Sequence, residues 1–323
     1  MPIATESKSS ESTQLAVEGI KGSIPDSQLS RLCPTAKNAP VEEMRRGLDE
    51  DGYLFVKNLI PRADVLNVRN HYFQNYENTG MLATHTTAEE GIFNSHADPD
   101  DHLGIGAGRL PDGDANVQRL VDSHSEPTYV EFLSHPALRQ QIRALMGWEK
   151  EVLLKRTVLR HNNPGSLSTG VHYDKIFLRS GGAYCLTAWI PLGDISLHGG
   201  WLMYLSTGKE LGKEIEADFD ARSALFPESE RINAYNSNMA EHGFLSNDAG
   251  AFLAEQGKGK GEWLVSEFEA GDVVFHDPYM VHGSTSNQDD KGRIRLSTDL
   301  RFAEEGSAFD QRWMQAWKPG DGL

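Results

Sequence analysis

The sequence contains little cysteine and no long apolar run. Cys33 and Cys185 are its only cysteines, and they lie far apart in the chain. This excludes a disulfide framework and a zinc site built from paired cysteines, and it favours a reducing compartment. No apolar run approaches the ~18 residues that would cross a bilayer, and the first residues lack a basic segment followed by an apolar one. We therefore expect a cytoplasmic protein without a membrane partner.

Positive charge is also scarce. The chain has 31 Lys and Arg against 47 Asp and Glu, so its formal net charge is −16 and its pI is near 5.2. Because phosphate binding depends on clustered basic residues, we expect no nucleic-acid partner. A small-molecule substrate is the expected partner, and the sequence leaves homo-oligomerisation open.

Changes of composition along the 323 residues suggest one domain after an amino-terminal arm. Residues 1–40 are rich in Ser, Thr, Glu, Lys and Pro, so a mobile arm is expected there, with room for one short docking segment. Residues 41–323 should form a single domain that opens with a helix, a short strand and a second helix. Residues 81–122 and 207–260 have the composition of lid-like insertions, and short β-prone runs dominate from residue 152 onward.

The last β-prone run has two contrasting faces. Along it, apolar residues and Thr298 alternate with polar ones: Ile294, Leu296, Thr298, Leu300 and Phe302 against Arg293, Arg295, Ser297, Asp299 and Arg301. This alternation predicts a strand with one apolar and one basic face. The basic face is either a binding surface for an anion or the outer face of an edge strand.

The stretch "GVHYDK" contains the first candidate metal ligands. Side chains two residues apart on a strand project to the same face, so His172 and Asp174 can close on one ion. A surface strand with a polar outer face is the simpler alternative. A third ligand should come from a later strand, where "GDVVFHDPYMVHGSTSN" offers His276 and His282. We favour His282, which stands at a strand end beside small residues, whereas His276 precedes an Asp-Pro turn.

Two histidines and one carboxylate form a facial triad that leaves three positions open and favours non-haem Fe(II). A 2-oxo acid cosubstrate would need a basic anchor, and Arg293 lies 11 residues after His282. Ser284, two residues after His282, adds a hydroxyl. A second His-x-Asp pair, His96 and Asp98, lies in a predicted turn and is not expected to bind metal.

Five separated stretches resemble the phytanoyl-CoA dioxygenase family of Fe(II)/2-oxoglutarate oxygenases, over about residues 41–302. They are "LDEDGYLFVKNLI", "VHYD", "AWIPLGD", "GGWLMYLS" and "EAGDVVFHDPYMVHGSTSN". The resemblance implies a mainly β fold with flanking helices (α+β), whose core is a double-stranded β-helix of the jelly-roll, cupin-like kind.

The same resemblance implies roles for individual residues. The catalytic iron would be held by His172, Asp174 and His282. The cosubstrate would be bound by Arg293, at the family's spacing, with Ser284 and Trp189 lining its pocket. Two departures leave the substrate open: Leu205 to Gly208 replace the family's Pro-Gly-Ser-His, and Tyr173 replaces its common Gln. The presence of Asp174 disfavours the halogenating relatives, which lack that carboxylate.

The implied enzyme is a non-haem Fe(II)/2-oxoglutarate-dependent dioxygenase that uses O2. We expect it to hydroxylate or oxidatively rearrange a small organic molecule, a secondary metabolite, while 2-oxoglutarate is decarboxylated to succinate and CO2. One alternative is an acyl-CoA 2-hydroxylase of the phytanoyl-CoA type, although this acidic chain offers no evident basic mouth for CoA phosphates. An alternative from another class is a cupin-like metal-binding protein, or a hydrolase or isomerase, without oxygen chemistry.

Overall fold

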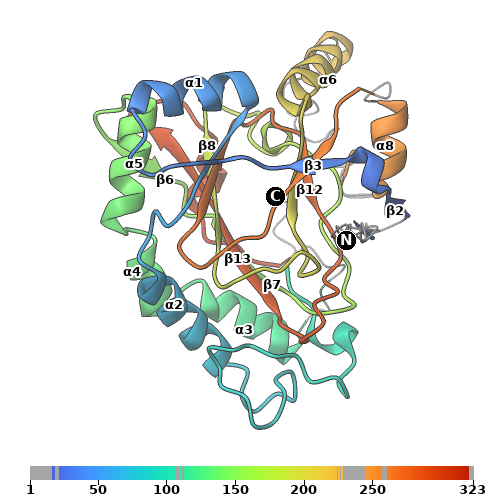
Figure 1. Ribbon diagram of the computed structural model, residues 1–323. Helices are drawn as coiled ribbons and strands as arrows, with labels where there is room; N and C mark the ends of the chain where they lie inside the picture. Colours follow the sequence, from blue (N-terminus) through green and yellow to red (C-terminus); the bar gives the residue numbers. More distant parts are fainter. Residues whose placement is uncertain are drawn as a thin grey trace, which may run out of the picture.

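Two facing β-sheets form the centre of the protein (Figure 1). The computed structural model describes residues 17–18, 22–105, 110, 113–223, 225, 227, 244–256 and 260–319. The smaller sheet has the order β12-β9-β10-β3, with strands His282–Ser284, Leu202–Leu205, Trp263–Val265 and Leu29–Arg31. The larger sheet has the order β4-β5-β11-β8-β13-β6, with strands Pro34–Thr35, Tyr53–Val56, Val273–His276, Leu186–Pro191, Arg295–Glu304 and Glu151–Leu153. In addition, β7 (Val158–Asn162) pairs with β13, and β1 (Val17–Glu18) pairs with β2 (Ser23–Ile24).

Helices cover the outer face of the larger sheet, as Figure 1 shows. They are α1 (Val41–Asp51), α2 (Arg62–Gln74), α4 (Pro127–Phe132) and α5 (Pro136–Met146), with α3 (Ala115–Ser123) beside β7. One face of strands β5, β11, β8 and β13 is buried against these helices; on β13 that face includes Leu296, Leu300 and Phe302. Because strand side chains alternate, the opposite faces of the same strands point toward the smaller sheet. Together the two sheets make the expected double-stranded β-helix.

The helix, strand, helix opening of the domain is confirmed. Helix α1 ends at Gly52, whose φ of 74° is the left-handed conformation that glycine adopts most readily at a helix end. Strand β5 follows at once, and α2 begins directly after Pro61. Helices α1 and α2 thus flank β5 in the chain and pack against the sheet that β5 joins.

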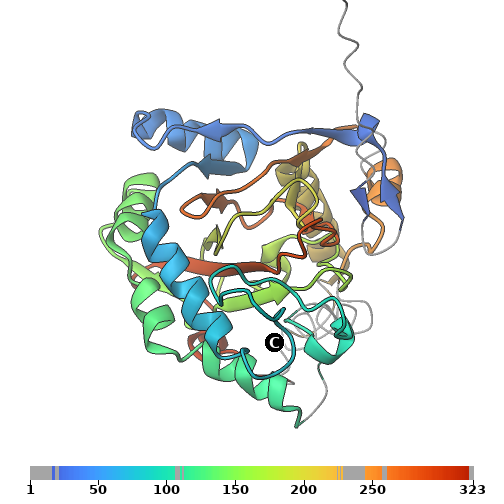
Figure 2. The same cartoon turned by 60° about the horizontal axis from the view of Figure 1, so that its bottom comes forward.

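The amino-terminal segment differs from the expected mobile arm. Strand β3 pairs in parallel with β10, and β4 pairs in parallel with β5. Residues 29–35 are thus part of both sheets, and Figure 2 shows this stretch, in blue, running along the edge of the sheets. These strands are only two or three residues long and are held by backbone hydrogen bonds, so no alternation of side chains marked them in the sequence. Residues 1–16 and 19–21 lie outside the described part of the chain.

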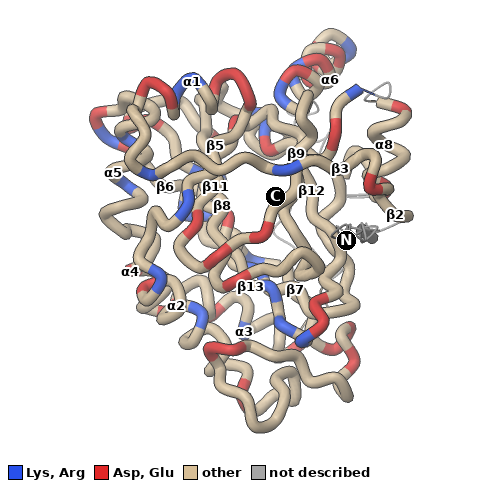
Figure 3. Tube along the Cα trace, viewed as in Figure 1, with Lys and Arg blue, Asp and Glu red and all other residues tan. Residues whose placement is uncertain are grey.

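Both expected insertions contain helices. The first, at residues 81–122, includes α3 and a short 3-10 turn, Pro99–His102. The second, at residues 207–260, includes α6 (Gly208–Ser223) and α8 (Ala249–Glu255), while most of residues 224–243 lie outside the described residues. Acidic and basic positions are mixed along α1 and α6 (Figure 3). None of the helices within the described residues is long and apolar enough to cross a membrane.

Candidate metal centre

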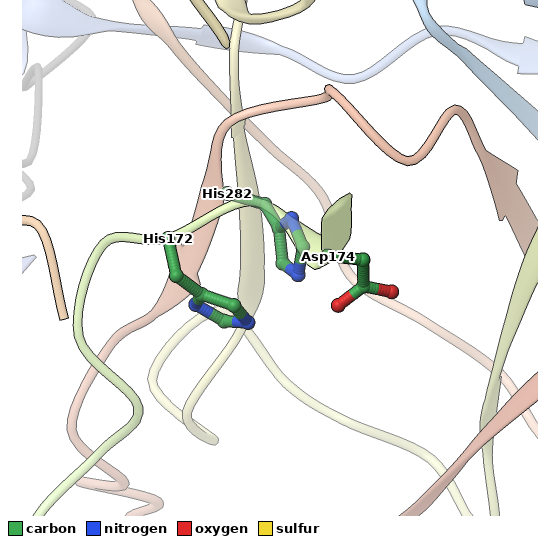
Figure 4. Close-up of side chains that lie close together, drawn as sticks. All are labelled: His172, Asp174 and His282. Atoms are coloured by element: carbon green, nitrogen blue, oxygen red, sulfur yellow. The ribbon is translucent and has the colours of Figure 1, made fainter. Parts of the chain in front are cut away.

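Three buried side chains meet between the two sheets: His172, Asp174 and His282. One potential ligand atom from each lies within 4.8 Å of the others. Figure 4 shows the two imidazole rings side by side with the carboxylate beyond them. These are the three residues that the sequence indicated, and the structure brings them together from segments more than 100 residues apart.

Main-chain pairing positions the two histidines. The His172 N–H donates to His282 O at 2.8 Å, and the His282 N–H donates to His172 O at 2.8 Å. Asp174 does not continue a strand as expected, because it begins a 3-10 turn, Asp174–Ile176. The intervening Tyr173 is nevertheless extended, with φ −137° and ψ 148°. This single extended residue is enough to keep His172 and Asp174 on the same side of the chain.

The protonation state of both histidines suits a cation. His172 Nδ1 lies 2.8 Å from Gly170 O, and His282 Nδ1 lies 2.8 Å from Met280 O. Since a carbonyl oxygen only accepts, each Nδ1 carries the proton and each Nε2 keeps a lone pair. Burial lowers the pKa of both rings, so the neutral form persists. Backbone acceptors of this kind orient metal-binding imidazoles in many sites.

Asp174 is held as an anion by a dense set of donors. Arg301 donates from Nε to Oδ2 at 3.1 Å and from Nη2 to Oδ1 at 2.9 Å. The Thr187 hydroxyl donates to Oδ2 at 2.5 Å. Burial raises the pKa of Asp174, but Arg301 and His276 outweigh it and hold that pKa well below its usual range. The carboxylate is therefore charged at neutral pH and fixed in orientation.

His276 lies behind this carboxylate. Its Nε2 is 3.3 Å from Asp174 Oδ2, and its Nδ1 is 2.8 Å from the Tyr204 hydroxyl. The ring nitrogen facing Asp174 donates, so the other nitrogen accepts from Tyr204. With both nitrogens engaged, His276 supports Asp174 and offers no free lone pair, in keeping with the choice of His282 over His276.

The basic face of β13 lines the inside of the β-helix. Arg301 reaches Asp174, Asp299 accepts from Arg160 Nη2 at 2.8 Å, and Arg295 Nη1 donates to Gly200 O at 2.7 Å. Strand β13 pairs with β8 on one side and with β6 and β7 on the other, so it is not an edge strand. The alternative of a basic outer face therefore does not hold.

The three cosubstrate residues expected from the sequence lie in different surroundings. Ser284, on β12, accepts the Thr169 N–H at 2.8 Å. Trp189 lies on the inner face of β8, and its ring centroid is 4.8 Å from that of Phe268. Arg293 lies just before β13, and its Nη2 donates to Asp289 Oδ2 at 2.7 Å. Arg293 also lines a surface groove of about 910 Å³.

In the second His-x-Asp pair, only Asp98 has a structural role. His96 and Asp98 are both exposed. The Asp98 carboxylate accepts the Asp100 N–H at 3.0 Å and so caps the short turn Pro99–His102. The predicted turn is present, and the pair does not converge on the buried group.

Sequence reasoning missed Arg301 as the partner of Asp174, and it did not assign a role to Thr187. The signal for Arg301 was present in the alternation of β13. An apolar strand face covered by helices leaves the polar face for the interior of a β-helix, so the basic residues had to point inward.

The phytanoyl-CoA dioxygenase (PhyH) family model matches residues 48–295. Several solved structures share the fold. The epimerase SnoN, in complex with Fe3+, alpha ketoglutarate and nogalamycin RO, is 16% identical over 88% of this chain and 91% of its own, with a TM-score of 0.51. The alpha ketoglutarate dependent carbocyclase SnoK from nogalamycin biosynthesis is 16% identical over 90% of this chain and 91% of its own, with a TM-score of 0.51. EctD from S. alaskensis, with bound Fe, is 14% identical over 87% of this chain and 82% of its own, with a TM-score of 0.50.

Among curated proteins no match to the chain is found. At identities this low the structural likeness establishes the fold, whereas the family model covers most of the sequence and includes all three residues of the buried group. The chain belongs to the phytanoyl-CoA dioxygenase family, and it is a non-haem Fe(II)- and 2-oxoglutarate-dependent enzyme.

Proposed function

We propose that this enzyme hydroxylates or oxidatively rearranges a small organic molecule, a secondary metabolite, with His172, Asp174 and His282 as its iron ligands. The observation that carries the proposal is the buried group itself: two neutral imidazoles and one charged carboxylate with ligand atoms within 4.8 Å of one another. Three protein ligands leave room on an octahedral ion for a chelating 2-oxo acid and for O2.

The donor set fits iron better than a structural zinc ion. Zinc in structural sites takes four protein ligands, and the metal-binding group found among the described residues has three. When bound, the iron would supply oxygen activation coupled to decarboxylation of 2-oxoglutarate to succinate and CO2. The protein would fix the ligands in position, bind the cosubstrate carboxylate and exclude water from the site.

The surroundings of His172 favour an apolar substrate. The rings of Phe177 and Phe244 lie 6.0 Å and 5.8 Å from the His172 ring, between centroids. A side chain at Gly170 would meet the Phe244 ring, because a Cβ there would be 2.5 Å from it. Aromatic walls beside a ligand histidine suit a compact molecule with an apolar ring or chain. They offer no charged group for the phosphates of an acyl-CoA.

The relatives in fold support the same substrate class. SnoN and SnoK belong to nogalamycin biosynthesis, and SnoN is bound to nogalamycin RO. At 16% identity these two structures establish the fold, and their substrates only support the proposal. For the cosubstrate, the family's spacing indicates Arg293, with Ser284 and Trp189 beside it.

The test is metal and cosubstrate binding by the purified full chain. We expect one equivalent of Fe(II) under anaerobic conditions, and a visible charge-transfer band when 2-oxoglutarate is added. Asp174→Asn should lose the metal. Asp98→Asn, in the other His-x-Asp pair, is the matched control and should keep it.

Two results would contradict the proposal in different ways. Metal retained by a folded Asp174→Asn variant would show that the buried group is structural. Metal bound without any band would indicate a metal protein that uses no 2-oxo acid. For the substrate, succinate release is measured with polyketide, terpenoid and acyl-CoA candidates; turnover of the CoA esters alone would rule out the secondary-metabolite assignment.

A further inference from the structure

Helix α6 packs on both chain segments that carry the buried group. Its residues Gly208, Gly212 and Glu216 are spaced four residues apart, so they share one face of the helix. A Cβ on Gly208 would lie 2.9 Å from Val281 N, and a Cβ on Gly212 would lie 1.9 Å from Tyr279 O. The two glycines therefore let the helix lie directly on the main chain that leads into β12.

The third residue of this face, Glu216, contacts the other segment. The Tyr173 hydroxyl donates to Glu216 Oε2 at 2.8 Å, and both side chains are buried. Arg179 donates from Nε to Glu216 Oε1 at 2.6 Å and from Nη2 to Oε2 at 2.5 Å. The Arg179 guanidinium in turn lies 3.7 Å from the centre of the Phe219 ring. A bidentate pair of this kind fixes the orientation of a carboxylate, so Glu216 is a rigid acceptor for the Tyr173 hydroxyl.

Tyr173 is the residue between two of the candidate metal ligands. Because side chains alternate along an extended chain, a Tyr173 side chain that is held toward α6 directs His172 and Asp174 together to the opposite side. No strand continues after Tyr173, since a 3-10 turn begins at Asp174. The extended conformation of this one residue, with φ −137° and ψ 148°, therefore sets how the two ligands face each other, and its side chain ends on Glu216.

Two departures from the family's sequence pattern meet at this contact. Tyr173 stands where the family commonly has Gln. Gly208, the last of the four residues that replace Pro-Gly-Ser-His, is the first residue of α6. In this chain the altered residue of the tripeptide and the altered segment after β9 are thus joined through Glu216, and the two changes form one structural feature.

We propose that Glu216 is a positioning residue of the metal centre: through Tyr173 it fixes the tripeptide in the extended conformation in which His172 and Asp174 face the same ion. This inference goes beyond the proposed function and rests on it, because it takes those two side chains as iron ligands. By this inference, the insertion at residues 207–260 contributes to the geometry of the metal centre.

The experiment measures the dissociation constant and the visible absorption spectrum of Co(II) bound to the full-length protein, in wild type, Tyr173→Phe, Glu216→Leu and the double variant. We expect each single variant to bind Co(II) about 10-fold more weakly, the lower end of the effect of removing a partner behind a metal ligand, and to alter the Co(II) band. The double variant should bind no more weakly than either single variant, because both substitutions remove the same contact. Glu216→Gln keeps an acceptor oxygen and should restore part of the affinity.

The matched control is Tyr129→Phe, which removes another buried phenol oxygen. The Tyr129 hydroxyl lies 2.7 Å from Thr298 Oγ1, on the face of β13 that the helices cover. This variant should lose stability in urea, as Tyr173→Phe does, but it should keep the Co(II) affinity and spectrum of the wild type. The comparison thereby separates a positioning role from general stabilisation of the fold.

The outcomes separate this inference from the proposed function. A wild type that binds no Co(II) contradicts the metal assignment itself. A wild type that binds Co(II) overturns only the present inference if Tyr173→Phe keeps that affinity and spectrum, if Tyr129→Phe loses as much affinity, or if the effects of the two substitutions add. Should Glu216→Leu fail to fold, Tyr173→Phe is compared with Glu216→Gln alone, and an unchanged Co(II) affinity in Tyr173→Phe would refute the role of Glu216.

Discussion

The ion pair between Arg301 and Asp174 leads to a test of whether Asp174 is a metal ligand or an ordinary buried carboxylate. Without metal, the Asp174 charge is balanced by Arg301, with two hydrogen bonds of 2.9 and 3.1 Å. Replacing Arg301 by Gln leaves that charge with Thr187 and His276 as donors. Removing one partner of a buried pair costs about 3 to 5 kcal/mol of unfolding free energy. We expect a loss of this size in the metal-free protein.

With a cation bound, the same substitution should cost less. The metal then supplies counter-charge to Asp174, so the remaining cost is that of lost charge-assisted hydrogen bonds, about 1.5 to 3 kcal/mol. The assay is urea unfolding of wild type and Arg301→Gln, first with a chelator and then with saturating Co(II), which does not undergo oxidation chemistry under these conditions. Metal should therefore rescue part of the defect.

The matched control is Arg160→Gln, which breaks the other interior pair, Arg160 with Asp299. This pair includes none of the three proposed ligands, so its loss should be equal with and without Co(II). The reasoning is refuted if Arg301→Gln costs the same in both conditions. It is refuted equally if metal rescues Arg160→Gln to the same extent.

Two further predictions concern stability alone. Gly47→Ala in α1 should stabilise the protein by about 0.5 to 1 kcal/mol through helix propensity, because a Cβ there meets nothing within 4 Å. Gly212→Ala in α6 should instead destabilise the protein, because a Cβ there would lie 1.9 Å from Tyr279 O. Thermal unfolding of the two variants measures both effects, and a stabilised Gly212→Ala variant would be inconsistent with the described packing. Burial lowers the pKa of His161 and of His124 to about 4. Between pH 6.5 and 4 the unfolded chain therefore binds more protons at these histidines than the folded protein does. Each histidine should lower the free energy of unfolding by about 2 kcal/mol when the pH falls to 5. Urea unfolding at pH 7 and pH 5 measures this loss, and His161→Gln should make the loss smaller. A loss that is unchanged or larger in His161→Gln would contradict the lowered pKa of His161.

The group of His172, Asp174 and His282 was predictable because its signal is local. Two ligands sit within one tripeptide, and the third stands beside Gly283 and Ser284 at the start of a strand. What the tripeptide could not reveal is that Asp174 leaves the extended conformation. That turn depends on contacts from distant segments, among them Thr187 and Arg301.

The position of the basic face required knowledge of the whole architecture. The alternation along β13 identified a strand, but which face is internal depends on where the helices pack. Spacing along the chain favoured Arg293, since a count of residues assumes a fixed length for the turn between β12 and β13. In the structure Asp289 and Arg293 pair within that segment, and β13 begins only at Arg295. The assignment of Arg293 from its spacing therefore stays a prediction, and the structure adds only that this side chain pairs with Asp289.

The amino-terminal strands have a consequence for how the protein is made. Strand β3 is synthesised well before its pairing partner β10, which lies at residues 263–265. During translation β3 must wait, unpaired, for more than 200 residues to emerge before the smaller sheet can be completed. The edge of β10 that does not pair with β9 is covered by β3, at residues 29–31. Closure of this edge is thus expected to be a late event in folding, and removal of residues 22–35 should leave a folded centre with an edge open to other chains.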